Sequence, residues 1–106
     1  ASVRIFLYVY SGNEGLAGYS LWVRKDGVDV PVNVVSFGGS PGFTWPFQDA
    51  RQRSQNWKAE FPDLPPAGQW EVQLIDDDGR IVGPPTTFII GPNDENLELY
   101  VRYERQ

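Results

Sequence analysis

Glycine and proline interrupt this chain at short intervals along its whole length. The 106 residues include 11 Gly and 9 Pro. They leave no long segment with the 3.6-residue apolar period of an amphipathic helix. The segments that remain are rich in β-branched and aromatic residues, which favour strands. The spacing of the turns therefore predicts an all-β protein with almost no helix.

Seven segments have the pattern of short strands. They are residues 3–10, 19–24, 29–37, 55–61, 69–75, 86–90 and 97–103. Turn signals recur at intervals of roughly 8–12 residues, which is typical of a β-sandwich. One of these signals, the sequence KDG at 25–27, is a tight hairpin turn. The length fits one domain, so residues 1–106 are expected to form a single seven-stranded antiparallel β-sandwich.

The inner faces of these strands can be assigned because side chains alternate between the two faces of a strand. The residues expected to face the core are Val3, Ile5, Leu7, Val9, Tyr19, Leu21, Val23, Leu97, Leu99, Val101 and Tyr103. Trp57 and Trp70 also alternate with their neighbours as core residues do. Trp70 is expected to take the place of the central tryptophan of a sandwich.

The opposite faces of three strands carry aromatic side chains beside charged ones. The aromatic residues are Phe6, Tyr8, Tyr10, Trp22 and Tyr100, and the arginines expected on the same side are Arg4, Arg24 and Arg102. An exposed apolar face framed by charges is typical of a protein interface. Residues 38–50 are expected to be a long loop or a broken strand. The alternative is that the long loop at 38–56 folds across these rings.

A second aromatic cluster lies within that long segment. Phe43, Trp45 and Phe47 stand close to Arg51 and to several glutamines. Rings that stack and amides that form hydrogen bonds suit a sugar-binding loop. The alternative is that the three rings plug one end of the sandwich.

The composition argues against catalysis and against nucleic acid as a partner. The chain has no His and no Cys, so Ser-His-Asp and Cys-His arrangements are excluded. Its net charge of -5 does not give the basic stripe that nucleic acid requires. No apolar run approaches the roughly 18–20 residues needed to span a membrane. We expect a protein that is not an enzyme and has no cofactor.

The three successive aspartates before Gly79 offer the one metal pattern in the chain. Asp76 and Asp78 stand at the spacing of the first ligands of a calcium loop, but the later acidic ligands are missing. Asp and Gly are also the residues that hairpin turns prefer. We therefore expect a turn here and no metal.

Two stretches resemble known β-sandwich modules. SGNEGLAGYSLWV at 11–23 resembles the opening of transthyretin-like and Cna-B-like modules, and AGQWEVQLIDDDGRIVGPPTTFII at 67–90 resembles the closing strands of bacterial Ig-like and fibronectin-III-like modules. The resemblance implies an Ig-like or transthyretin-like fold and an extracellular or cell-surface location. Such modules serve as spacers, adhesins, filament subunits or accessory domains, so fold alone does not define the function.

These observations predict a structural or assembly module of a bacterial surface or secreted protein. Its partners would be copies of itself or neighbouring domains, contacted through the aromatic sheet face. The alternative is a carbohydrate-binding accessory module that uses the 38–56 segment.

Overall fold

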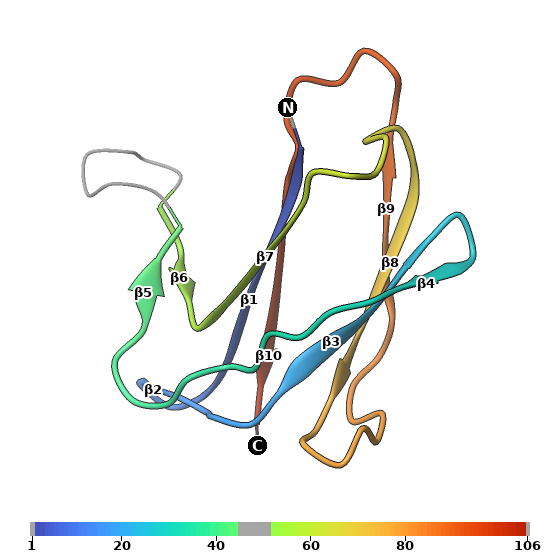
Figure 1. Cartoon of the computed structure of the whole chain (residues 1–106). Helices are drawn as coiled ribbons and strands as arrows, with labels where there is room; N and C mark the ends of the chain where they lie inside the picture. Colours follow the sequence, from blue (N-terminus) through green and yellow to red (C-terminus); the bar gives the residue numbers. More distant parts are fainter. Residues whose placement is uncertain (1, 45–51, 106) are drawn as a thin grey trace.

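The chain forms ten strands in the part that the structure, a computed structural model, describes, which is residues 2–44 and 52–105 (Figure 1). Three of the strands have only two residues: β2 (Glu14–Gly15), β5 (Gly42–Phe43) and β6 (Ser54–Gln55). No described residue lies in a helix. The prediction of an all-β protein is confirmed.

β1 (Val3–Ser11) lies in the middle of the first sheet. β10 (Glu98–Glu104) runs parallel to it on one side. On the other side, β7 (Trp57–Phe61) and then β2 run antiparallel to it. The prediction of a wholly antiparallel fold is thus wrong for the first and last strands. No hairpin joins these two strands, so no short connection forces them to be antiparallel.

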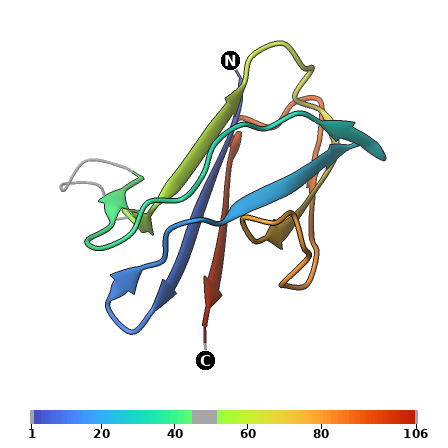
Figure 2. The same cartoon turned by 60° about the horizontal axis from the view of Figure 1, so that its bottom comes forward.

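The second sheet has the order β4-β3-β8-β9, and every pair in it is antiparallel. Its strands are β4 (Val28–Val30), β3 (Ser20–Lys25), β8 (Gly68–Ile75) and β9 (Thr86–Ile90). Figure 2 shows this sheet crossing the first one in projection. Buried side chains of both sheets belong to one hydrophobic core, an arrangement consistent with a β-sandwich.

The strand predicted at 29–37 is shorter than expected. β4 ends at Val30, because Pro31 has no backbone N–H to continue a ladder. The following residues run from the second sheet toward the first (Figure 1). The carbonyl of Val34 accepts hydrogen bonds from the Ser20 hydroxyl at 2.7 Å and from the Trp57 indole at 2.9 Å. This segment therefore ties the edges of the two sheets together.

The predicted inner faces are confirmed. The buried residues among those expected inside are Val3, Ile5, Leu7, Val9, Leu21, Val23, Leu97, Leu99 and Val101, while Tyr19 and Tyr103 are partly buried and pack against this core. Trp57 and Trp70 are 1% and 0% exposed. The Trp70 indole donates to the Pro66 carbonyl at 2.9 Å, so its polar atom is paired although the ring is buried.

A buried asparagine fills a gap in the first sheet. The pairing of β7 with β1 ends at Leu7, and the pairing of β2 with β1 begins at Tyr10. Asn56 serves Val9, the second of the two residues between them: its Oδ1 accepts from the Val9 N–H at 3.0 Å, and its Nδ2 lies 2.9 Å from the Val9 carbonyl. Nδ2 also donates to the carbonyls of Leu16 and Phe37. The Leu16 N–H also donates to the Val9 carbonyl at 2.9 Å, so Asn56 and Leu16 together pair the backbone of Val9.

Replacing Trp70 by alanine should lower the free energy of unfolding by about 3–5 kcal/mol, the usual range for a large buried ring. The measurement is urea denaturation of the two proteins side by side. A loss below about 1 kcal/mol would show that the ring does not lie in the core.

Asn56→Asp should lower the free energy of unfolding by at least about 3 kcal/mol at neutral pH. The change keeps the size of the side chain but removes the donors that face three carbonyls and adds a buried charge. Asn96→Asp is the matched control, because the exposed Asn96 acts through its oxygen, which accepts from the Glu98 N–H. The control should change stability by less than about 0.5 kcal/mol; equal losses in both variants would contradict the role assigned to Asn56.

Candidate interaction surfaces

The predicted aromatic face is partly covered. Phe6 and Tyr8 are only 3% and 6% exposed, so the expectation that they form an open contact surface is wrong. Tyr10 and Tyr100 keep intermediate exposure. The Tyr100 hydroxyl donates to the Ser54 carbonyl at 2.6 Å, which places β6 against this side of the sheet. This contact favours the alternative that part of residues 38–56 folds across the rings, and Ser54 is the described residue of that segment that shows it.

The exposed end of this face is closed by an arginine. The rings of Tyr8 and Tyr10 stack with centroids 4.4 Å apart and planes 5° from parallel. Arg102 donates to the Tyr10 hydroxyl at 2.7 Å, and its guanidinium lies 5.1 Å from the centroid of that ring. This hydrogen bond raises the pKa of Arg102 above its usual value. A permanent charge therefore holds the exposed end of the stack.

Trp22 does not belong to this face. It lies on β3 in the second sheet, whereas the other four predicted interface residues lie on β1 and β10 in the first. The prediction of one continuous face of five aromatics is wrong for this reason. Alternation assigns the two sides of each strand, but it does not say which strands share a sheet.

On its own sheet, Trp22 is held by two charged neighbours, Asp29 and Arg24. Its indole N–H donates to Asp29 Oδ1 at 2.8 Å. The Arg24 guanidinium stacks 4.1 Å from its ring centroid and forms an ion pair of 2.7 Å with Glu71. The half-buried ring is therefore fixed in one orientation.

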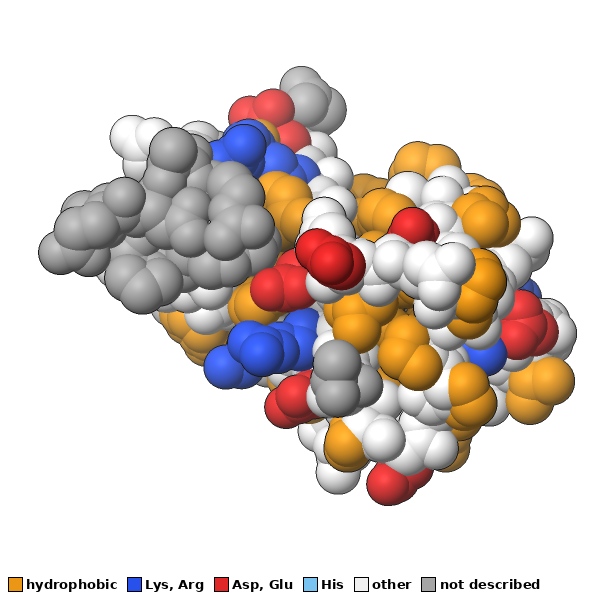
Figure 3. Space-filling view, turned by 90° about the horizontal axis from the view of Figure 1, so that it is seen from above, with side chains coloured by type: hydrophobic (Ala, Val, Ile, Leu, Met, Phe, Trp, Pro, Cys, Tyr) orange, Lys and Arg blue, Asp and Glu red, His pale blue; other side chains and the backbone are white. Residues whose placement is uncertain are grey.

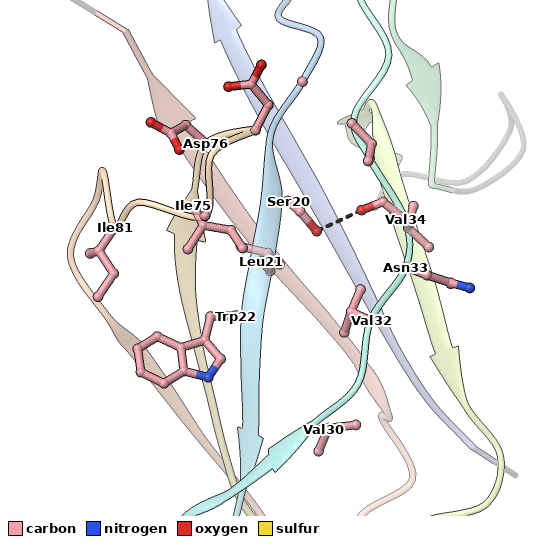
Figure 4. A pocket seen from close by; sticks show the side chains of 14 residues that line it. Ser20, Leu21, Trp22, Val30, Val32, Asn33, Val34, Ile75, Asp76 and Ile81 are labelled. Atoms are coloured by element: carbon pink, nitrogen blue, oxygen red, sulfur yellow. Dashed lines mark hydrogen bonds between the residues drawn. The ribbon is translucent and has the colours of Figure 1, made fainter.

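A groove of about 470 Å³ lies beside Trp22 (Figure 4). Most of its lining is apolar: Leu21, Trp22, Val30, Val32, Val34, Val35, Ile75 and Ile81, with Ser20 and Asn33 among the polar members. The side chains come from both sides of β3, as Figure 4 shows. Val35 and Ile81 are 62% and 52% exposed, large fractions for aliphatic side chains. These two side chains and the half-buried Trp22 form an exposed apolar rim, whereas Leu21, Val30, Val32 and Val34 belong to or pack against the core.

The sequence gives only a weak signal for this groove. Residues 29–37 were expected to form a regular strand, which would have paired them along β3. Val34 and Val35 are two consecutive apolar residues that break the alternation, and Pro31 ends the ladder. Together these features indicate an irregular apolar segment, but they do not place it beside Trp22.

A second groove of about 590 Å³ lies between residues 25–31 and residues 60–64. Figure 3 looks down on the end of the molecule where the turn after β7 lies, and hydrophobic side chains gather there on the half away from the grey residues. Val28, Phe61 and Leu64 line this groove together with five charged residues: Lys25, Asp26, Asp29, Glu60 and Asp63. Its charged rim distinguishes it from the groove beside Trp22.

The predicted sugar-binding cluster is described only at its first residue. Phe43 on β5 is 46% exposed. Trp45, Phe47 and Arg51 lie outside the described residues. The carbohydrate-binding function therefore stays a prediction.

The three aspartates lie in a turn that is held by hydrogen bonds from backbone N–H groups to the carboxylate of Asp76. Asp76 Oδ1 accepts from the backbone N–H groups of Asp78 and Arg80 at 3.0 and 2.9 Å. Gly79 has a φ of 80°, which a side chain would strain. Carboxylate oxygens of Asp76, Asp77 and Asp78 lie within 4.8 Å of one another. The geometry is that of the expected hairpin turn, and the absence of a metal stays a prediction.

Comparison with family models, with curated proteins and with solved structures finds no match to this chain. In the described residues there is no helix that would be long and apolar enough to cross a membrane.

The stability contributed by Tyr100 should depend on pH. Burial raises the pKa of its hydroxyl above 10.0, partly offset by Arg102 and Arg53. A raised pKa gives stability that is present below the unfolded pKa of about 10 and is lost as the pH rises through the folded value. The stability advantage of wild type over Tyr100→Phe should therefore shrink between about pH 8 and pH 11. Urea denaturation at both pH values measures it; an advantage that does not change with pH would contradict the burial of this hydroxyl under β6.

Proposed function

We propose that this chain is a non-enzymatic structural or assembly module of a bacterial surface or secreted protein. It contacts copies of itself or neighbouring domains through the outer face of β3. The contact surface is the groove beside Trp22, which replaces the larger aromatic face expected from the sequence.

The fold part of this proposal is an Ig-like or transthyretin-like β-sandwich. Seven of the ten described strands have three or more residues, which agrees with the strand number expected for such a module. Trp70 is fully buried within the common core of the two sheets, as the central tryptophan of a sandwich would be. The two sequence stretches that resemble such modules include β3 and the β8–β9 hairpin.

The observation that carries the contact surface is the fixed Trp22 beside an open apolar groove. Tryptophan and arginine are enriched among the residues that dominate binding energy in interfaces. Here the ring is already oriented by Asp29 and Arg24, so binding would cost little side-chain entropy. Val35 and Ile81 add exposed aliphatic area on the two sides. A partner that covers the groove would remove this area from water.

The proposal of a module without catalysis has support from the residue types. Without His and Cys, the chain lacks the commonest general base and the commonest strong nucleophile. The closest group of acids, Asp76 to Asp78, belongs to a turn in which Asp76 bonds to the backbone. These carboxylates organise a hairpin.

Ile81→Glu and Val35→Glu should each weaken self-association of the chain at least tenfold, because a carboxylate in the groove must be desolvated on contact. Light scattering and sedimentation across protein concentration measure the association. Val82→Glu is the matched control: Val82 is 48% exposed but lies outside the groove. The circular dichroism spectra of all three variants should match wild type. An association that all three variants leave unchanged would contradict this surface.

A further inference from the structure

Four of the longer described strands have one edge without a strand partner: β4, β7, β9 and β10. Three of these edges carry features that oppose further pairing. β4 is three residues long and is followed by Pro31. β7 bears Lys58 and Glu60, and β10 bears Arg102 and Glu104. Charges, prolines and short length are the usual means by which proteins protect sheet edges.

β9 has none of these features within its length. Its sequence is Thr-Thr-Phe-Ile-Ile, with no charge, no glycine and no proline. Ile89 is 70% exposed, the largest fraction among the exposed large hydrophobic side chains. Residues 81–93 contain no charged residue, and Pro85 and Pro92 lie just outside the strand. The edge is therefore suited to pairing over five residues and no further.

The free backbone groups of β9 are identified by the register of the second sheet. Asp26 N–H donates to the Gln69 carbonyl, so Gln69 faces β3. Because antiparallel strands alternate the direction of their backbone groups, Trp70 and Val72 face β9. Their partners are Phe88 and Thr86. The N–H and C=O groups of Thr87 and Ile89 therefore point to the free edge.

A groove of about 490 Å³ runs between this edge and β10. Phe88, Ile90 and Leu99 contribute its apolar lining, and Asp94 and Glu95 lie among its acidic members. A strand added beside β9 would turn every second side chain toward this groove. The site thus offers both backbone partners and a place for apolar side chains.

We propose that β9 pairs antiparallel with β9 of a second copy of this chain about a two-fold axis at Phe88. Thr87 of each copy then exchanges two backbone hydrogen bonds with Ile89 of the other. The four residues with free groups satisfy one another, which is the self-complementarity that a two-fold interface needs. Phe88 of each copy lies opposite its equivalent, over the groove.

The same register keeps like charges apart. Pro85 of one copy faces Gly91 of the other, so Asp94 and Glu95 lie near the uncharged residues that precede β9 in the second copy. The remaining electrostatic term is long-range repulsion between two chains of net charge -5. Salt screens this repulsion, so added salt should strengthen the dimer.

This inference extends the proposed assembly function to a second surface, and a disulfide experiment tests it separately. The chain has no cysteine, so Thr87→Cys and Ile89→Cys each introduce a single thiol at an exposed position. In the proposed dimer, residue 87 lies about 5.5 Å at Cα from residue 89 of the other copy. The two copies of residue 87 lie more than about 7 Å apart, which is beyond the reach of a disulfide.

Mild oxidation of an equal mixture of the two variants should give the 87–89 disulfide in large excess over both homodisulfides, as measured by mass spectrometry. Val28→Cys, which is 68% exposed on the β4 edge, is the control for random collision and should cross-link no faster than unfolded chain. Equal yields of the three disulfides, or a control as fast as the mixture, would overturn the proposal. A dominant 87–87 product would overturn it too, because it requires parallel pairing or an antiparallel register centred on residue 87 instead of residue 88.

A second variant tests the hydrogen bonds themselves. Ile89→Pro removes an N–H that the ladder with β8 does not use, so the monomer should keep its fold while the dimer loses at least tenfold in affinity. Ile81→Glu, which changes the groove beside Trp22, should leave the 87–89 disulfide intact. These two variants thus distinguish a wrong assignment of the β9 edge from a wrong assignment of the groove beside Trp22.

Discussion

The fold depends on one buried amide. Asn56 is fully buried and joins β1, through Val9, to the carbonyls of Leu16 and Phe37. β1 needs this contact because its neighbour changes from β7 to β2 near Val9. The Val9 carbonyl also accepts from the Leu16 N–H, but the Val9 N–H is paired by Asn56 and would otherwise be buried without that partner. The segment that leaves β3's sheet is anchored at Phe37 by the same side chain. Asn56 therefore helps to position both the segment at 30–35, which lines the groove beside Trp22, and the start of β7 at Trp57.

The core-facing residues of the strands can be predicted from the sequence, because the alternation of apolar residues marks the buried face of each strand. Val3, Ile5 and Leu7 alternate with residues of the other face, and a one-residue error of register would expose all of them. The KDG turn was predicted for the same local reason: Asp26 and Gly27 adopt φ values of 51° and 82°, which a two-residue hairpin requires. Asn56 was missed because a buried asparagine between strand residues looks like any polar residue of a strand end.

The exposure of the outward-facing side chains cannot be predicted from periodicity, because the pattern of one strand does not show whether another segment covers it. Phe6 and Tyr8 show the same alternation whether a loop covers them or solvent does. Covering them is favourable because apolar rings are removed from water, and Tyr100 adds a hydrogen bond to Ser54 that holds the cover. Trp22 has the same pattern but remains half-buried, because its strand pairs into the other sheet. The local sequence thus predicted that the outer faces carry aromatic residues, but it did not determine whether those residues are covered or exposed.

The strand order leaves a free edge on the last strand of each sheet. β10 ends the first sheet beside β1, and β9 ends the second sheet beside β8. The residues of β10 that face outward include Arg102 and Glu104, so its edge resists pairing. β9 must instead supply apolar side chains to the core through Phe88 and Ile90, and its remaining positions carry Thr87 and Ile89 with no charge. An uncharged edge with an exposed Ile89 favours pairing with another strand. The five-residue length of β9 and its flanking prolines limit that pairing to a single strand, which favours a closed dimer over an open fibre.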